Sequence, residues 1–264
     1  MLTKGSDVAA EGGKIDPMHQ FTVEPLFGTI NWHFPFTNSA LWMVITLACL
    51  WLFMLGGMKR ELVPGRWQAA VEGVTGFING MMATNVGPEG KRFVPLVFTL
   101  FMFILLSNIL GMMPIGITGA HPFTSTSHFT VTGVLALLAF GTVLVVGFAR
   151  HGFHFFSLFI PSGTPKLMIP LMFVIELMSF LVRPFSLALR LFVAMTAGHI
   201  LLKVLAGFVI NASNAGIGYG ILVGAPSFVL MVGISALELL VCVIQAYVFA
   251  LLTSLYLNDA VNLH

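Results

Sequence analysis

Arg190 is an ionisable residue in the middle of an apolar run, Pro184–His199, and two further ionisable residues precede it at equal steps. Arg183 lies seven residues before it and Glu176 a further seven. Because an α-helix advances about 100° per residue, a step of seven returns to nearly the same face. An arginine at the centre of a bilayer costs at least about 2.5–3.5 kcal/mol, so it is expected to face protein or water rather than lipid. The spacing therefore predicts a charged stripe along one membrane helix.

Two serines continue this stripe. Ser179 and Ser186 stand between the ionisable residues, so that polar side chains follow one another at steps of three and four from Glu176 to Arg190. Such a polar seam inside an apolar helix is typical of an ion or proton pathway. Two structural alternatives remain open, because Glu176 can simply pair with Arg183, and Arg183 can extend its charge to the membrane surface. Arg190 is too central for its charge to reach the membrane surface, and no carboxylate lies one turn away in the sequence. We therefore expect its counter-charge on another subunit.

A second polar group combines an imidazole with a carboxylate. His199 lies nine residues past Arg190, about half a turn around the helix, and is expected to face a different neighbour. On the last apolar segment, Glu238 and Gln245 are seven residues apart and share a face. An imidazole and a carboxylate at comparable depth on adjacent antiparallel helices are the components of a proton relay. A packing bridge without a role in transport is the alternative. Lys203, one turn past His199, can place its charge at the membrane surface.

The composition is that of an integral membrane protein. Hydrophobic residues make up 58% of the 264 residues and charged residues 8%, whereas soluble domains carry about 25% charged residues. No Asp, Glu, Lys or Arg occurs from Phe93 to Ala149. The formal net charge is only +2 and the basic residues form no long tract, which argues against nucleic-acid binding. The histidines outside the apolar runs are interpreted as interfacial residues, and we expect no cofactor and no metal.

The apolar segments are long enough to cross a bilayer as helices. They predict an all-α polytopic membrane protein, a single membrane domain over residues 1–264 with five transmembrane helices and one membrane-surface helix. The surface helix is expected over 67–86, where small, apolar and polar residues alternate. The expected parts are a polar tail at 1–37, a first span at 38–57, a loop with the surface helix at 58–92, a helical hairpin at 93–149 and a tilted helical hairpin at 166–258.

The last two apolar segments are longer than a bilayer requires. Residues 167–210 are largely apolar and would extend about 66 Å as one helix at about 1.5 Å per residue. Either this helix is steeply tilted, or Pro170 and Pro184 break it into pieces. Residues 221–257 are over-long as well. Two such helices in succession indicate a tilted hairpin that packs against a partner. Between the third and fourth spans, 150–166 is expected to be a loop.

The charges of the loops predict the orientation of the chain. The loops at 58–92 and 150–166 are basic, whereas 114–130 and 211–220 carry no charge. Lysines and arginines are enriched on the cytoplasmic side of membrane proteins. The N-terminus is therefore expected outside and the C-terminus in the cytoplasm.

Three stretches of the chain resemble a known family. They are Arg183–Leu201, with its Ser-Leu-Ala-Leu-Arg-Leu-Phe core, Leu239–Leu252, and Ser107–Pro114. In order and spacing they are similar to subunit a of the F-type rotary ATP synthase over most of the chain. The resemblance implies a stator subunit of a bacterial inner membrane, whose two offset half-channels couple proton flow to rotation of the c-ring and ATP synthesis. The implied partners are the c-ring, the subunit b stalk and the rest of the ATP synthase, whose other subunits carry the ATP chemistry.

The resemblance also implies roles for single residues. Arg190 would be the arginine that faces the carboxylate of each passing c subunit, and Glu176 the acid of the cytoplasmic half-channel. Gln245 would approach the arginine from the last helix. Asn108 matches the Asn-containing second span of the family.

The outer half-channel of some family members pairs a glutamate with a histidine. His199 and Glu238 would fill these positions in the reverse order. Ala194 stands where the family commonly has Asn, and Gly111 and Gly116 replace acidic residues that some members carry. The resemblance therefore implies a less charged entrance in this chain.

Two other classes of membrane protein compete with this interpretation. A proton-coupled secondary transporter could bind an anionic solute and a proton with intramembrane Arg and Glu side chains, but such folds usually contain internal repeats, and none is visible in this sequence. A haem- or quinone-binding subunit would need two histidines at matching depth on facing helices. Only His199 lies clearly within an apolar segment.

Overall fold

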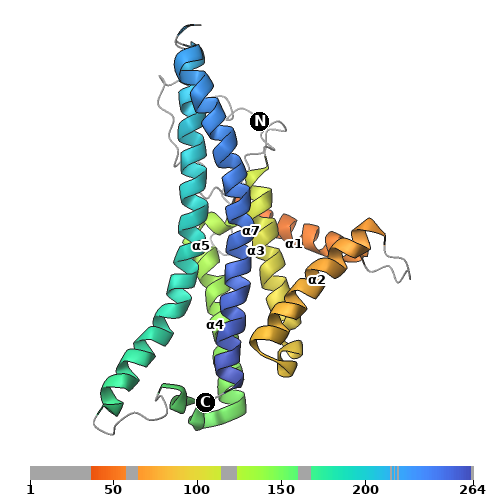
Figure 1. Cartoon of the computed structure of the whole chain (residues 1–264), viewed down its shortest axis with the longest axis vertical. Helices are drawn as coiled ribbons and strands as arrows, with labels where there is room; N and C mark the ends of the chain where they lie inside the picture. The colour runs from red at the N-terminus through yellow and green to blue at the C-terminus, as the bar shows by residue number, and fades with distance from the viewer. Residues whose placement is uncertain are drawn as a thin grey trace, which may run out of the picture.

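Five long apolar helices dominate the computed structural model, which describes residues 37–57, 65–113, 124–159, 168–214, 216, 218 and 220–262. They are α1 (Asn38–Gly57), α3 (Val94–Met112), α4 (Phe129–His151), α5 (Ile169–Asn214) and α7 (Ala225–Val261) (Figure 1). Each is long and apolar enough to cross a membrane, which confirms the predicted all-α polytopic fold. The expected tail before Thr37, as well as Gly116 and His121, lies outside the described residues.

The helix that carries Arg190 is not broken by its prolines. α5 is one helix of 46 residues with Pro184 inside it, so the predicted alternative of a break at Pro170 and Pro184 is wrong. Pro170 lies in the first turn, where no intrahelical bond is lost. Within a membrane bundle, neighbouring side chains and helices can satisfy the backbone groups that Pro184 frees. At about 1.5 Å per residue, α5 extends about 69 Å, more than twice the hydrocarbon thickness of a bilayer.

The two long helices form the C-terminal hairpin. A π-helical segment, η7 (Gly220–Gly224), leads directly into α7, and α7 then runs antiparallel to α5 along most of the molecule (Figure 1). Ala246 and Ala250 of α7 are completely buried, and such small residues let helices approach closely in a membrane. Near its N-terminal end α5 diverges from α7 (Figure 1).

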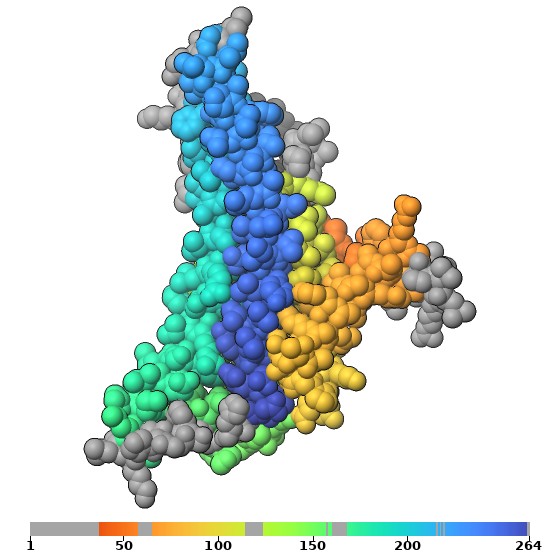
Figure 2. Space-filling model, in the orientation of Figure 1, coloured from red at the N-terminus to blue at the C-terminus, as the bar shows by residue number. Residues whose placement is uncertain are grey.

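The hairpin packs on one side against the helices that precede it. Ile104 of α3, Val143 of α4 and Met195 of α5 are at most 1% exposed and belong to one common core. On the other side, α5 and α7 present apolar side chains such as Val193 and Leu240 that the described part of the chain leaves exposed. Figure 2 shows these two helices at the surface along the length of the molecule. The hairpin therefore has one packed face and one long apolar face.

α2 (Arg66–Asn85) lies obliquely beside the bundle and is not among the helices that could span a membrane (Figure 1). Trp67 Nε1 donates to the carbonyl oxygen of Phe53 at 3.0 Å, and Asn85 Nδ2 donates to Ser254 Oγ at 2.8 Å. These contacts attach the two ends of α2 to α1 and α7. Its position along the membrane surface stays a prediction.

The segment after α4 differs from the predicted loop at 150–166. α4 continues to His151, and a 3-10 helix, η6 (Gly152–Phe159), follows it. The reason is aromatic burial, since Phe155 and Phe159 are at most 2% exposed and the Phe159 ring lies 5.3 Å from that of Phe180 on α5. A short helix keeps these rings against α5, which the apolar composition of this segment allows.

Candidate functional site

Arg190 lies near the middle of α5 on its exposed face. Its neighbours on that face include Phe185 and Val193, which are 56% and 53% exposed. Within the described residues no carboxylate forms an ion pair with Arg190. A guanidinium on an apolar membrane face is costly unless another protein or water meets it. The charge therefore points to a binding partner on this face.

The predicted polar stripe divides into two parts. Ser179, Ser186 and Arg190 are exposed, whereas Glu176 and Arg183 are only partly exposed. The exposed residues follow one face of α5. The side chain of Arg183 leaves this face and contacts Asp259 of α7. One helix thus carries both an exposed polar row and a charge that pairs with the neighbouring helix.

Arg183 is held by residues at the C-terminal end of α7 and by neighbours on its own helix, α5. Its Nη1 donates to Asp259 Oδ2 at 2.8 Å, whereas its Nη2 is 3.8 Å from Glu176 Oε1. The guanidinium also lies over the rings of Phe180 and Tyr256, at 5.6 and 5.1 Å from their centroids. The pairing of Glu176 with Arg183 is thus present but secondary. The sequence analysis missed Asp259, although it is the one charged residue after Glu238.

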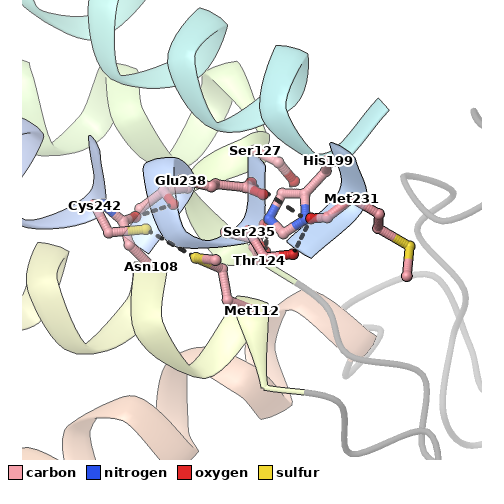
Figure 3. Close-up of polar contacts among 10 residues, drawn as sticks. Asn108, Met112, Thr124, Ser127, His199, Met231, Ser235, Glu238 and Cys242 are labelled. Carbon is pink, nitrogen blue, oxygen red and sulfur yellow. Dashed lines mark hydrogen bonds and ion pairs between the residues drawn. The ribbon is translucent and has the colours of Figure 1, made fainter. Parts of the chain in front are cut away.

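The structure brings His199 and Glu238 together inside the bundle. Their side chains are 12% and 3% exposed, and Nδ1 of His199 is 3.8 Å from Oε1 of Glu238 (Figure 3). Gly198 makes this approach possible, because a Cβ atom at this position would lie only 2.6 Å from the same carboxylate oxygen. The other ring nitrogen, Nε2, is 2.7 Å from Thr124 Oγ1. The imidazole therefore lies between a carboxylate and a hydroxyl.

A run of hydroxyl residues, Thr124–Ser127, enters the bundle beside this pair. All four residues are at most 5% exposed, and three of them form the 3-10 turn η5 (Ser125–Ser127). Thr126 Oγ1 donates to Asn108 Oδ1 at 2.6 Å, which connects the turn to α3. The sequence analysis treated this segment as part of an uncharged loop. The signal that it missed is four consecutive hydroxyl side chains in an otherwise apolar region.

Several polar atoms of this interior group keep unused hydrogen-bonding capacity. Within the described residues, buried atoms without a hydrogen-bond partner include Ser107 Oγ, Asn108 Nδ2, Ser125 Oγ and both carboxylate oxygens of Glu238. Buried polar groups are normally hydrogen-bonded, so a cluster of exceptions indicates either sites that water occupies or a role in chemistry. Such atoms are suited to bind water or to exchange protons.

Gln245 is partly exposed on α7, two turns past Glu238. In the part of the chain that the structure describes, Gln245 and Arg190 form no hydrogen bond with one another. Nor do the described residues contain a group of three or more His, Cys, Asp or Glu side chains that could hold a metal ion.

Comparison with known proteins identifies close relatives. The family model described as ATP synthase A chain matches residues 39–258. An ATP synthase subunit a of Rhizorhabdus wittichii is 73% identical over 261 residues, covering 97% of this chain and all of the relative. Proteins of the same name are 65% identical in Erythrobacter litoralis, with 97% of this chain and 100% of the relative covered, and 64% in Novosphingobium aromaticivorans, with 96% and 99% covered.

Proposed function

The chain belongs to the family of ATP synthase subunit a, the proton-translocating stator component of the F-type ATP synthase, and we propose that its α5–α7 hairpin carries protons to and from a ring of c subunits. The observation that carries this proposal is Arg190. It is an exposed charge on an apolar face, without an ion-paired carboxylate in the described chain. A carboxylate on a passing c subunit would supply the missing counter-charge.

The outer half-channel in this proposal runs through the bundle interior. A proton enters near His199, passes to Glu238 and then reaches the ring carboxylate. The distance of 3.8 Å between Nδ1 of His199 and Oε1 of Glu238, and the absence of hydrogen-bond partners for both carboxylate oxygens among the described residues, support this route. Asn108 and the hydroxyl run Thr124–Ser127 line the same region.

In this proposal the ring turns because a protonated and an ionised carboxyl group differ in the cost of facing lipid. Protonation makes it neutral, and a neutral carboxyl group can face lipid at a modest cost, whereas an ionised one cannot. One elementary charge moved across 100 mV is worth about 2.3 kcal/mol. Several protons must therefore contribute to each ATP, and rotation of the ring adds their contributions.

The cytoplasmic half-channel in this proposal follows the other end of α5. The ring carboxylate loses its proton there near Glu176, Ser179 and Ser186, of which the two serines are exposed on the partner-facing side. Arg190, between the two half-channels, favours the ionised carboxylate and prevents protons from passing straight through. Gln245 approaches the same position from α7.

The proposal includes the setting of the subunit. We place it in a bacterial inner membrane with the N-terminus outside and the C-terminus in the cytoplasm, as the basic loops predict. Its partners are the c-ring, the subunit b stalk and the rest of the ATP synthase. ATP binding and hydrolysis are assigned to other subunits of that complex.

ATP-driven acidification of inverted membrane vesicles tests the role of Arg190. The complete complex with Arg190→Ala is compared with the unchanged complex at equal amounts of assembled subunits. We expect proton pumping to be lost while the complex remains assembled. Undiminished pumping would overturn the proposal.

Arg150→Ala is the matched control for this experiment. Arg150, at the C-terminal end of α4, pairs with Glu89 of the 3-10 segment η3 (Pro88–Arg92), and neither residue belongs to the α5–α7 hairpin. Removing this arginine changes the net charge by the same amount but leaves the α5 face intact. Pumping is expected to persist in this variant.

A further inference from the structure

The two ring nitrogens of His199 face different groups. Nδ1 lies 3.8 Å from Glu238 Oε1, and Nε2 lies 2.7 Å from Thr124 Oγ1 (Figure 3). Only the second distance is that of a hydrogen bond. The hydroxyl of Thr124 is therefore the contact that sets the orientation of the ring.

Thr124 is itself held in place by its surroundings. It is 5% exposed, and its carbonyl oxygen accepts a hydrogen bond from Ser127 Oγ at 2.6 Å. Gly111 of α3 packs directly against it, since a Cβ atom at that position would collide with the Thr124 side chain. Thr196 Oγ1, on α5, donates to the carbonyl oxygen of Ser127 at 3.4 Å. The hydroxyl is thus fixed between α3 and α5.

We propose that Thr124 is a positioning residue that fixes the proton of His199 on Nε2 and leaves Nδ1 as the nitrogen that exchanges protons with Glu238. The proposal rests on the proposed function of His199 and Glu238 as the outer half-channel. A hydroxyl can accept an N–H or donate to a bare ring nitrogen, and we assign Thr124 Oγ1 the accepting role toward Nε2–H. An oxygen at 2.7 Å from Nε2 can accept that N–H in both the neutral ring and the imidazolium.

The proton balance of the step is simple. An arriving proton binds the lone pair of Nδ1 and makes an imidazolium. The Nδ1–H bond then breaks and an O–H bond forms on Glu238, which gives a neutral ring and a neutral carboxyl group. Throughout, Nε2–H stays bonded to Thr124, so that the ring does not have to turn before the next proton arrives.

Among the described residues, two charged groups near His199 come from α7 and α5. Glu238 approaches from α7, and Lys203 follows one turn later on α5. The groups that α3 and the hydroxyl run contribute are uncharged. Thr124 is therefore suited to orient the ring without adding a charge to the pathway.

The test compares variants of Thr124 in the complete complex by ATP-driven acidification of inverted vesicles, per assembled complex. Thr124→Val keeps the shape but removes the hydroxyl, and Thr124→Ser keeps the hydroxyl. Loss of one orienting hydrogen bond is expected to lower pumping about three- to tenfold in Thr124→Val, and by less than about twofold in Thr124→Ser. Thr124→Ala, which cannot overfill the site, replaces the valine variant if that variant does not assemble.

Thr132→Val is the matched control. Thr132 is also buried, but within the described residues its hydroxyl donates to the carbonyl oxygens of His128 and Phe129, at the start of its own helix, and not to a side chain. Pumping should stay within about twofold of the unchanged complex. An equal loss in this control would overturn the proposal, because the effect would not depend on His199.

A double variant separates this inference from the proposed function. If Thr124 acts through His199, then Thr124→Val has no additional effect once His199→Ala is present. A further loss on top of His199→Ala, or normal pumping in Thr124→Val while His199→Ala is impaired, would overturn the inference alone. Normal pumping in His199→Ala would instead overturn the proposed outer half-channel, and the inference with it.

Discussion

Arg183 of α5 and Asp259 of α7 form an ion pair of 2.8 Å that joins the two long helices below the level of Arg190. His199 and Glu238 join the same helices above it. Sixteen residues separate Arg183 from His199, about 24 Å along a helix. Two polar contacts therefore join α5 to α7: Arg183–Asp259, the lower tie, and His199–Glu238, the upper tie. The exposed Arg190 lies on α5 between them.

The lower tie is expected to contribute to the stability of the hairpin. Arg183→Gln or Asp259→Asn leaves a half-buried charge without its main partner, so each should lower the melting temperature of the purified complex. Because the side chains are 24% and 38% exposed, the coupling between the two changes should be about 1 kcal/mol. The double variant should therefore lose less than the sum of the single variants. Strictly additive losses would contradict the pairing.

Gly198→Ala is expected to disturb the upper tie. The new Cβ atom would lie 2.6 Å from Glu238 Oε1 and 2.8 Å from its Cδ, so the carboxylate must move away from His199. Overfilling a packed site costs about 1–3 kcal/mol, and vesicle acidification should fall as well. Gly141→Ala on α4 is the control, since nothing lies within 4 Å of a Cβ atom there. A normal pumping rate in Gly198→Ala would show that the close approach is unimportant.

Glu238→Gln is expected to abolish most proton pumping. The amide keeps the shape of the side chain but cannot take up and release a proton, so a relay through this position should slow at least about tenfold. Glu72→Gln on α2 removes a carboxylate that bonds Gln68 at 2.8 Å, away from the hairpin, and should pump normally. The rate of acidification in inverted vesicles measures both. If both variants pump alike, Glu238 serves only in packing.

The aromatic cluster of η6 is expected to stabilise the fold. Phe155 is 1% exposed and its ring lies 6.2 Å from that of Phe180, so Phe155→Ala should cost about 3–5 kcal/mol. Phe153, two residues earlier, is 93% exposed, and Phe153→Ala should change stability by less than about 0.5 kcal/mol. Thermal unfolding of the purified complex measures the difference. Equal losses would mean that η6 does not pack as described.

The polar stripe of α5 illustrates what periodicity can predict. A step of seven correctly associated Arg183 with Glu176, which lie 3.8 Å apart, because both belong to one helix. It could not predict that Arg183 turns to Asp259, 76 residues away. Nor could proline content predict the continuity of α5, since the effect of Pro184 depends on the helices around it.

The sequence by itself determined the membrane class, the number of long apolar helices and the position of the isolated Arg190, because hydropathy and helical periodicity are properties of local sequence. Only the tertiary structure decided which polar groups meet. Thr124 reaches His199 across 75 residues, and Gly198 opens the space that Glu238 enters from another helix. The physical reason is that such contacts depend on how closely helices pack, which no single segment specifies.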